Sequence, residues 1–280
     1  MSINDWIAPD AMKGKVVFIT GGGSGINLGI GKTFARVGAD VAICGRSLER
    51  LEGAARELEA LGARVSASVA DVRDYDALAA ALETSRRELG SVDVLVCGAA
   101  GNFVARAEAM NAKGFRTVVE IDLLGSFNAS HAAFGQLKET RGSILFISAG
   151  QSVMPFVGQS HGGAAKAGID NLMASLALEW GRFGIRSNAL VPGAIAGTEG
   201  MKRLDEAAGE DTWTSMIPLG RYGGTDEVGA MAVMLSLPLS SYVTGTRVVV
   251  DGGMALSGSG LYNRAVSLPA LERLTKMPPR

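Results

Sequence analysis

The stretch Thr20-Gly21-Gly22-Gly23-Ser24-Gly25-Ile26-Asn27-Leu28-Gly29 lies between an apolar run at 16–20 and a helical pattern that extends to Gly38. Glycines in such a turn let the backbone bend tightly and approach a pyrophosphate, and unpaired N–H groups at the start of the next helix meet its charge. A glycine cluster alone is a weak signal, but here a strand precedes it, a helix follows it and a second strand follows the helix at the expected spacing, which makes the signal stronger. The stretch therefore predicts a dinucleotide-binding βαβ unit.

Short β-branched runs alternate with longer amphipathic stretches along the rest of the chain, where Leu48, Leu51 and Leu58 recur at helical spacing and are expected in the core. This alternation is typical of a parallel sheet built through right-handed crossovers. We expect a Rossmann-like, doubly wound α/β fold of about seven strands with helices on both faces. The expected strands are Val16 to Thr20, Val41 to Cys44, Arg64 to Val69, Val92 to Cys97, Ser143 to Ser148, Arg186 to Val191 and Thr246 to Val250.

The length of 280 residues suits one α/β domain, so residues 1–280 are expected to form a single unit. Two long intervals, 98–112 and 192–225, do not fit the strand and helix pattern. Both follow the ends of predicted strands, where open α/β sheets bind ligands, and long connections often form binding loops. We expect a substrate loop at about 192–225 and a C-terminal arm at about 256–280.

Charge and cysteine content exclude several classes of partner. The net charge of −1 gives no general attraction to nucleic acid or to anionic membranes, and no run approaches ~18 uncharged apolar residues. Cys44 and Cys97 lie in apolar runs, which favours free thiols in a reducing, cytoplasmic compartment. His131 has no nearby pattern of metal ligands, so no metal site is expected.

The residues after the second predicted strand indicate which dinucleotide is preferred. A carboxylate at this position would accept hydrogen bonds from the adenosine ribose, but the chain reads Cys44-Gly45-Arg46-Ser47. Arg46, with Ser47 beside it, can form charge-assisted hydrogen bonds to a ribose 2′-phosphate. NADP(H) is therefore expected rather than NAD(H), unless Arg46 is an ordinary solvated residue.

The glycine stretch resembles the Thr-Gly-x-x-x-Gly-Ile-Gly motif of the short-chain dehydrogenase/reductase family, and the likeness extends from about Lys15 to Met254. One departure is Asn27 in place of the last glycine, so its side chain must either displace the helix or make a polar contact. Asp71 matches an adenine-contacting position, although it could equally cap a helix. The expected cofactor-binding residues are Gly21, Ser24, Gly25, Ile26, Arg46, Ser47, Asp71, Val72, Ala99, Lys166, Pro192, Gly193, Ile195 and Thr198.

Three of the four catalytic positions of this family differ in the chain. Gly162 stands where the tyrosine is expected, Ala149 replaces its serine partner and Asp122 replaces the asparagine. Only Lys166 remains. Asp122 is either a helix carboxylate that pairs with a cation, or a buried acid that delivers a proton through water, and the residues leave both open because burial and a charged Lys166 would act on it in opposite directions.

Four segments resemble 2,4-dienoyl-CoA reductases of the peroxisomal type, which also lack the tyrosine. They are residues 97–103, Ile121-Asp122, His161 and residues 192–200. The resemblance implies that Asp122 and Lys166 form the catalytic pair and that hydride passes from NADPH to the far end of a conjugated dienoyl thioester. Charge then builds on the thioester oxygen, which needs hydrogen-bond donors. The implied substrate contacts are Asn102 as the leading donor, Phe103 along the acyl path, and Arg73 and Arg203 on the CoA portion.

Alternatives remain for the proton donor and for the function. His161 and Ser148 compete with Asp122, although Ser148 should face the other side of its strand. The chain could instead be an NADP-dependent carbonyl reductase, or a catalytically silent NADP(H)-binding sensor. The resemblance also implies a homotetramer or homodimer formed through the helices that carry Asp122 and Lys166.

Overall fold

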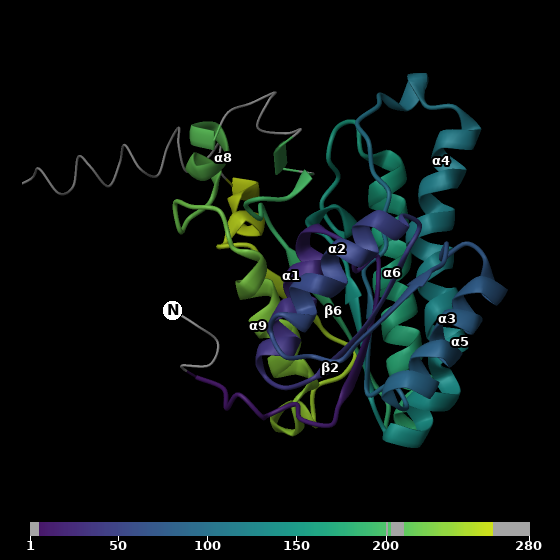
Figure 1. Cartoon of the computed structure of the whole chain (residues 1–280). Coiled ribbons are helices and arrows are strands. Elements are labelled where there is room, and N and C mark those ends of the chain that lie inside the picture. The colour runs from purple at the N-terminus through teal and green to yellow at the C-terminus, as the bar shows by residue number, and fades with distance from the viewer. Residues whose placement is uncertain (1–5, 200, 203–209, 260–280) are drawn as a thin grey trace, which may run out of the picture.

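The computed structural model describes residues 6–199, 201–202 and 210–259. Within these residues, seven parallel strands form one sheet, and helices cover both of its faces (Figure 1). The Rossmann-like fold is confirmed, and each expected strand is present with small shifts at its ends. The strands are β1 (Val16–Thr20), β2 (Asp40–Gly45), β3 (Val65–Val69), β4 (Val94–Cys97), β5 (Ser143–Ile147), β6 (Arg186–Pro192) and β7 (Arg247–Val250).

The order of the strands places a ligand-binding position in the middle of the sheet. The order is β3-β2-β1-β4-β5-β6-β7, so the chain runs outward from β1 to β3 and then returns to the other side of β1. Thr20 at the end of β1 pairs in register with Cys44 on one side and Cys97 on the other. The loops after β1 and β4 therefore begin side by side, at the point where open α/β sheets bind dinucleotides.

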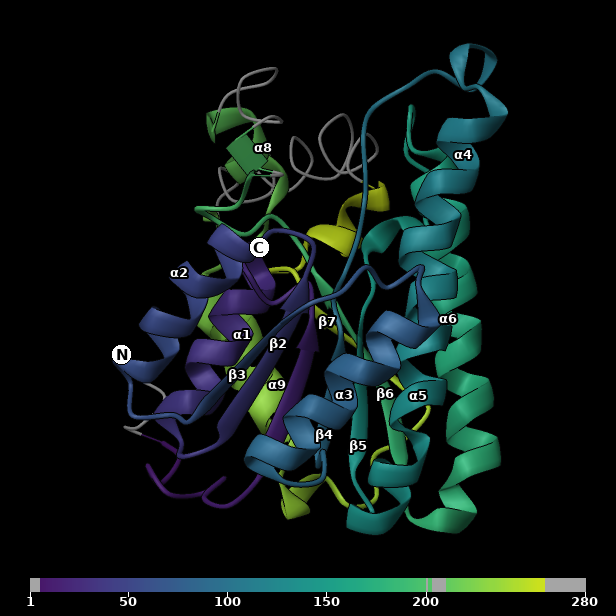
Figure 2. The ribbon, with the colours of Figure 1, turned by 45° about the vertical axis from the view of Figure 1, so that its right-hand side comes forward.

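Three long helices lie on each face of the sheet (Figure 2). One face carries α1 (Gly25–Arg36), α2 (Leu48–Glu59) and α9 (Thr225–Ser236); the other carries α3 (Tyr75–Leu89), α5 (Gly125–Thr140) and α6 (Ser160–Trp180). Other helical segments within the described ranges are η2 (Ala107–Ala109), α4 (Ala112–Val119), η3 (Glu120–Leu124), η4 (Gly150–Ser152), η5 (Gly181–Phe183), α8 (Glu210–Met216), η6 (Pro238–Ser240) and η7 (Met254–Ser259).

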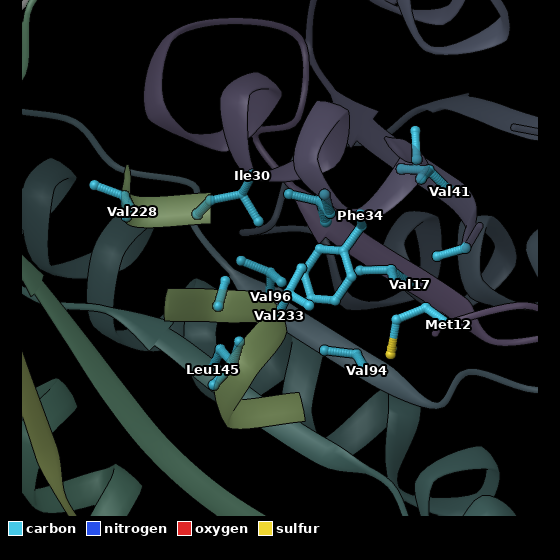
Figure 3. Packing of buried hydrophobic residues seen from close by; sticks show 14 of the residues in the cluster. Met12, Val17, Ile30, Phe34, Val41, Val94, Val96, Leu145, Val228 and Val233 are labelled. Carbon is cyan, nitrogen blue, oxygen red and sulfur yellow. The ribbon is translucent and has the colours of Figure 1, made fainter. Parts of the chain in front are cut away.

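The core on the α1 side packs Ile30, Phe34 and Val233 against the strands (Figure 3). Leu51 and Leu58 are buried as expected, but the expectation for Leu48 was wrong because this residue opens α2 and is 58% exposed. No helix in the described ranges is both long enough and apolar enough to cross a membrane.

The segment after β6 is a long connection, as expected. Ile195 forms a parallel bridge with Gly223, and α8 lies between them in the sequence. Arg203 lies outside the described residues, and so does the expected C-terminal arm from residue 260 onward.

Helices α1 and α9 approach each other closely at two glycines. A Cβ atom at Gly229 would lie 2.1 Å from the Oγ1 of Thr33, and one at Gly29 would lie 2.3 Å from the Cβ of Thr225. Thr33 is fully buried, and its hydroxyl donates to the Gly29 carbonyl at 2.9 Å. The contact therefore leaves no room for a side chain at either glycine.

Replacement of Gly229 by alanine should lower the free energy of unfolding by about 1–3 kcal/mol, the usual cost of overpacking a core. Gly53→Ala is the matched control, because Gly53 lies inside α2 with no atom within 4 Å of an added Cβ. That variant should gain about 0.5–1 kcal/mol. Urea denaturation measures the free energy of unfolding of both variants. An equal increase in Gly229→Ala and Gly53→Ala would show that the α1–α9 contact is not tight.

Candidate active site

A cleft of about 900 Å³ opens where the loops after β1 and β4 begin. It contains most of the expected cofactor residues, whereas Pro192, Gly193, Ile195 and Lys166 do not line it. Arg50 and Glu199, which the sequence did not single out, face each other in this cleft and form an ion pair of 3.0 Å. The expected residues that line the cleft are Gly21, Ser24, Gly25, Ile26, Arg46, Ser47, Asp71, Val72, Ala99, Asn102 and Thr198.

The loop at the start of α1 has the form that a pyrophosphate requires. Gly21 and Gly25 have φ angles of 69° and 58°, which favour glycine, and a Cβ at Gly21 would lie 2.9 Å from the Cα of Ala99. Ser24 precedes α1 without making a side-chain cap, and the first turn of the helix has no acidic residue. The backbone N–H groups of the first turn of α1 are thus available to an anion, so the site fits a dinucleotide.

Asn27 makes a polar contact, one of the two outcomes expected for it. Its Nδ2 donates to the carbonyl of Gly98 at 2.8 Å and to that of Gly21 at 3.2 Å. Two carbonyl acceptors fix which end of the amide is the nitrogen. A Cβ at Gly98 would lie 2.2 Å from Asn27 Oδ1, so the asparagine also requires a glycine at the end of β4. Asn27 therefore ties the two loops of the cleft together.

Arg73 and Asp71 are bound to each other. The guanidinium of Arg73 donates from Nη2 to Asp71 Oδ2 at 2.6 Å and from Nε to Oδ1 at 3.0 Å. These hydrogen bonds lower the pKa of Asp71. The cap of α3 is Asp74, which accepts from Ala77 N, so the interpretation of Asp71 as a helix cap was wrong. The Arg73 guanidinium, which was expected to contact the CoA portion, therefore binds Asp71 in this structure.

Asp122 and Lys166 form a buried ion pair. Asp122 lies in the π-helical turn η3 between α4 and α5, and its side chain is 2% exposed. Its Oδ2 is 3.2 Å from Lys166 Nζ, and its Oδ1 accepts from Gly101 N at 2.7 Å. A π turn changes the direction of side chains within a helix and is frequent at functional sites. Asp122 therefore pairs with a cation, as one of the two interpretations expected, and it is also buried, as the other requires.

Lys166 lies on α6 and completes this network. Its Nζ also donates to the carbonyl of Ile147, at the end of β5, at 2.9 Å. Both oxygens of Asp122 meet donors, which suits an ionised carboxylate because that form accepts only. Lys166 thus links α6, the end of β5 and Asp122 in one network.

Asn102 lies beside the glycine that replaces the tyrosine. A Cβ at Gly162 would lie 3.3 Å from Asn102 Oδ1. Because Gly162 precedes Lys166 by four residues, both positions lie on one face of α6. The carboxamide of Asn102 therefore lies in tight contact with the position at which a side chain at residue 162 would begin.

The other candidate proton donors are separate from the ion pair. His161 is fully buried, its ring packs 4.5 Å from that of Phe103, and neither nitrogen has a hydrogen-bond partner among the described residues. The buried hydroxyl of Ser148 also lacks a partner there, and Ser148 does not line the cleft. Phe103 is 41% exposed and follows Asn102 in the loop between β4 and η2. In the described ranges, no group of three potential ligands is placed to hold a metal ion.

Comparisons with known proteins agree with this geometry. The family profile described as "Enoyl-(Acyl carrier protein) reductase" matches residues 21–255. The chain is 43% identical to the Saccharomyces cerevisiae peroxisomal 2,4-dienoyl-CoA reductase [(3E)-enoyl-CoA-producing], over 88% of this chain and 86% of that protein. It is 36% identical to a probable 2,4-dienoyl-CoA reductase [(2E)-enoyl-CoA-producing] of Bacillus subtilis, over 88% of this chain and 98% of that protein.

A solved structure of a short chain oxidoreductase from Pseudomonas aeruginosa is also similar. It is NADPH-bound and described as containing an atypical catalytic center; it is 31% identical with a TM-score of 0.79, and the match covers 86% of this chain and 96% of that one. The glycine loop, the strand order and these matches lead to one conclusion: the chain belongs to the short-chain dehydrogenase/reductase family.

Proposed function

We propose that this protein is an NADPH-dependent reductase of 2,4-dienoyl-CoA thioesters that works without a catalytic tyrosine. The observation that carries the proposal is the buried Asp122–Lys166 pair, which holds Gly101 while the next residue, Asn102, lies beside Gly162. The relatives from yeast and Bacillus subtilis are both named 2,4-dienoyl-CoA reductase, which supports the choice of substrate. The yeast protein is named for a (3E)-enoyl-CoA product, which is the product proposed below.

The proposed reaction begins at the far end of the conjugated chain. NADPH, when bound, would supply a hydride to the carbon at position 5 of the acyl group. The electron pairs of the diene then shift toward the carbonyl, and the thioester becomes a dienolate with its charge on oxygen. Protonation at the carbon next to the carbonyl gives a 3-enoyl-CoA, so one hydride and one proton are consumed in each turnover.

The residues on the substrate side would stabilise the charge that develops. The Nδ2 group of Asn102 is our donor to the thioester oxygen, because preorganised donors at a developing oxyanion contribute strongly to catalysis. We assign proton delivery to the Asp122–Lys166 pair acting through water, with Asp122 keeping the ammonium group in place. We further assign Phe103 to the acyl path.

Arg46 and Ser47 would distinguish NADPH from NADH. Both line the cleft at the end of β2, and Arg50 lies one turn further along α2. Arginine donors suit the 2′-phosphate, which NADH lacks. Arg50 would then exchange its exposed contact with Glu199 for the phosphate.

We also propose a cytoplasmic homo-oligomer, either a dimer or a tetramer. Apolar side chains are exposed on the segments that carry the ion pair, η3 and α6, and on the helices that flank η3, which supports self-association through them: Phe115, Leu124, Phe127 and Leu178. Burial raises the pKa of Cys44 and of Cys97 to about 12, and both remain free thiols, as suits a reducing compartment.

NADPH oxidation by the purified protein tests the proposed function. We expect turnover with a 2,4-dienoyl-CoA and none with the matching 2-enoyl-CoA or with a panel of ketones, because only the diene carries charge from position 5 to the thioester. Turnover of the ketones alone would identify a carbonyl reductase. NADPH binding without turnover of any substrate would instead support the silent sensor.

The Asp122→Asn substitution should lower dienoyl turnover by about 10²-fold to 10⁴-fold, the range typical of a lost acid–base group. A neutral amide cannot hold the Lys166 ammonium as the carboxylate does, although the NADPH dissociation constant should change little because Asp122 does not line the cofactor cleft. Stopped-flow reduction and fluorescence titration measure the two quantities. The exposed Asp76→Asn variant is the control, and an active Asp122→Asn enzyme would remove Asp122 from this role.

For Arg46→Ala we expect about 10-fold to 100-fold weaker NADPH binding, since charged hydrogen bonds contribute about 1.5–3 kcal/mol. NADH binding should remain nearly unchanged because NADH has no 2′-phosphate. Isothermal titration with both cofactors makes the comparison, with the exposed Arg56→Ala variant as the control. Equal losses for NADPH and NADH would contradict the assignment.

A further inference from the structure

The carboxamide of Asn102 is held at both of its ends. Its Nδ2 donates to Gln159 Oε1 at 2.6 Å, and its Oδ1 accepts from the N–H of Phe103 at 2.9 Å. An amide nitrogen carries two protons, so one N–H of Asn102 is left over after the bond to Gln159. The two contacts fix the direction in which this remaining N–H points.

The loop that carries Asn102 is anchored one residue earlier as well. Gly101 donates its N–H to Asp122, which belongs to the π turn between α4 and α5. Gln159, in contrast, stands immediately before the first residue of α6. Gly101 is therefore tied to η3, and the next residue, Asn102, is tied to the start of α6.

The side chain of Gln159 does not cap its helix, so its amide oxygen is free to accept a hydrogen bond from Asn102. It occupies the N-cap position of α6, yet its side chain makes no capping hydrogen bond. Glutamine is also not among the residues that usually fill this position. Its Oε1 accepts instead from a residue that is distant in sequence.

Gly162 provides the space for the Asn102–Gln159 contact. A Cβ at this position would lie 3.3 Å from Asn102 Oδ1 and 3.3 Å from Gln159 Oε1. Both distances are tighter than ordinary van der Waals contact, so a side chain at residue 162 would require Asn102 and Gln159 to shift by a few tenths of an ångström. Glycine at this position leaves their hydrogen bond undisturbed.

We infer that Gln159 is a positioning residue, which orients Asn102 so that its remaining N–H faces the thioester oxygen on the Lys166 face of α6. This inference rests on the proposed function. It adds a group that touches neither cofactor nor substrate and acts only through Asn102. The hydrogen bond between Asn102 and Gln159 thus lies beside the position from which the tyrosine is missing.

Gln159→Met and Gln159→Glu form a matched pair of variants. Methionine keeps the length of the side chain and removes the acceptor, whereas glutamate retains an acceptor for Asn102. We expect kcat on the dienoyl-CoA to fall about 10-fold to 100-fold in Gln159→Met, since small misplacements of a reacting group cost this much. Gln159→Glu should stay within a few-fold of the unaltered enzyme, and the KM for NADPH and the melting temperature should move little in either variant.

A double-variant comparison separates positioning from a general effect on structure. In the Asn102→Ala background, Gln159→Met should cause no further loss of kcat, because the group that it orients is already absent. A further loss of the same size as in the unaltered enzyme would overturn the inference. Activity of Gln159→Met equal to that of Gln159→Glu would also overturn it.

The hydrogen bond itself has a readout that does not depend on the substrate. In a ¹H–¹⁵N spectrum, one side-chain amide proton of Asn102 should be protected from exchange with water and should lose that protection in Gln159→Met. If the unaltered enzyme reduced no dienoyl-CoA, the proposed function would fail while this spectrum still decided the contact. Unchanged Asn102 signals in Gln159→Met would show that Gln159 does not hold the amide.

Discussion

The buried pair of Asp122 and Lys166 joins four parts of the protein at one point. Asp122 holds the loop after β4 through Gly101, and Lys166 reaches from α6 to the carbonyl of Ile147 at the end of β5. A buried charge is tolerated only when a partner and hydrogen bonds compensate it, and loss of one partner costs about 3–5 kcal/mol. The π turn places the carboxylate where all these contacts are possible.

The cofactor cleft depends on a second set of contacts at the centre of the sheet. Thr20 accepts from the N–H groups of Gly98 and Ala99 through its Oγ1, while Asn27 donates to carbonyls on both loops. The loop after β4 is thus held by β1 at its start and by Asp122 a few residues later. The same short segment connects the cofactor site to Asn102.

Much of this arrangement could be predicted from local sequence. Alternation of apolar runs and amphipathic stretches predicts the seven strands, and the glycine pattern predicts the loop before α1, because both depend on near neighbours. Pairing of Asp122 with Lys166 followed from a family resemblance. Leu48 was expected in the core but is exposed, because it is the first residue of α2 and periodicity alone does not decide burial at the end of a helix.

The remaining features depend on contacts between distant segments. The ion pair of Arg50 with Glu199 joins residues that are far apart in the sequence, so no local pattern indicates it. The approach of Asn102 and Gln159 above Gly162 requires the loop after β4 and the start of α6 to be placed in space. A glycine at the tyrosine position shows which proton donor is missing, while the structure shows which side chains lie beside that position.

We propose that a site built on Asp122, Lys166 and Asn102 reduces a conjugated thioester at its far end. Turnover of a 2,4-dienoyl-CoA with NADPH that carries deuterium at the transferred position tests this proposal through the position of the label. We predict a 3-enoyl-CoA with deuterium on carbon 5 and a solvent proton on the carbon next to the carbonyl. Deuterium next to the carbonyl, or an acyl chain without deuterium, would show that hydride does not add at the far end.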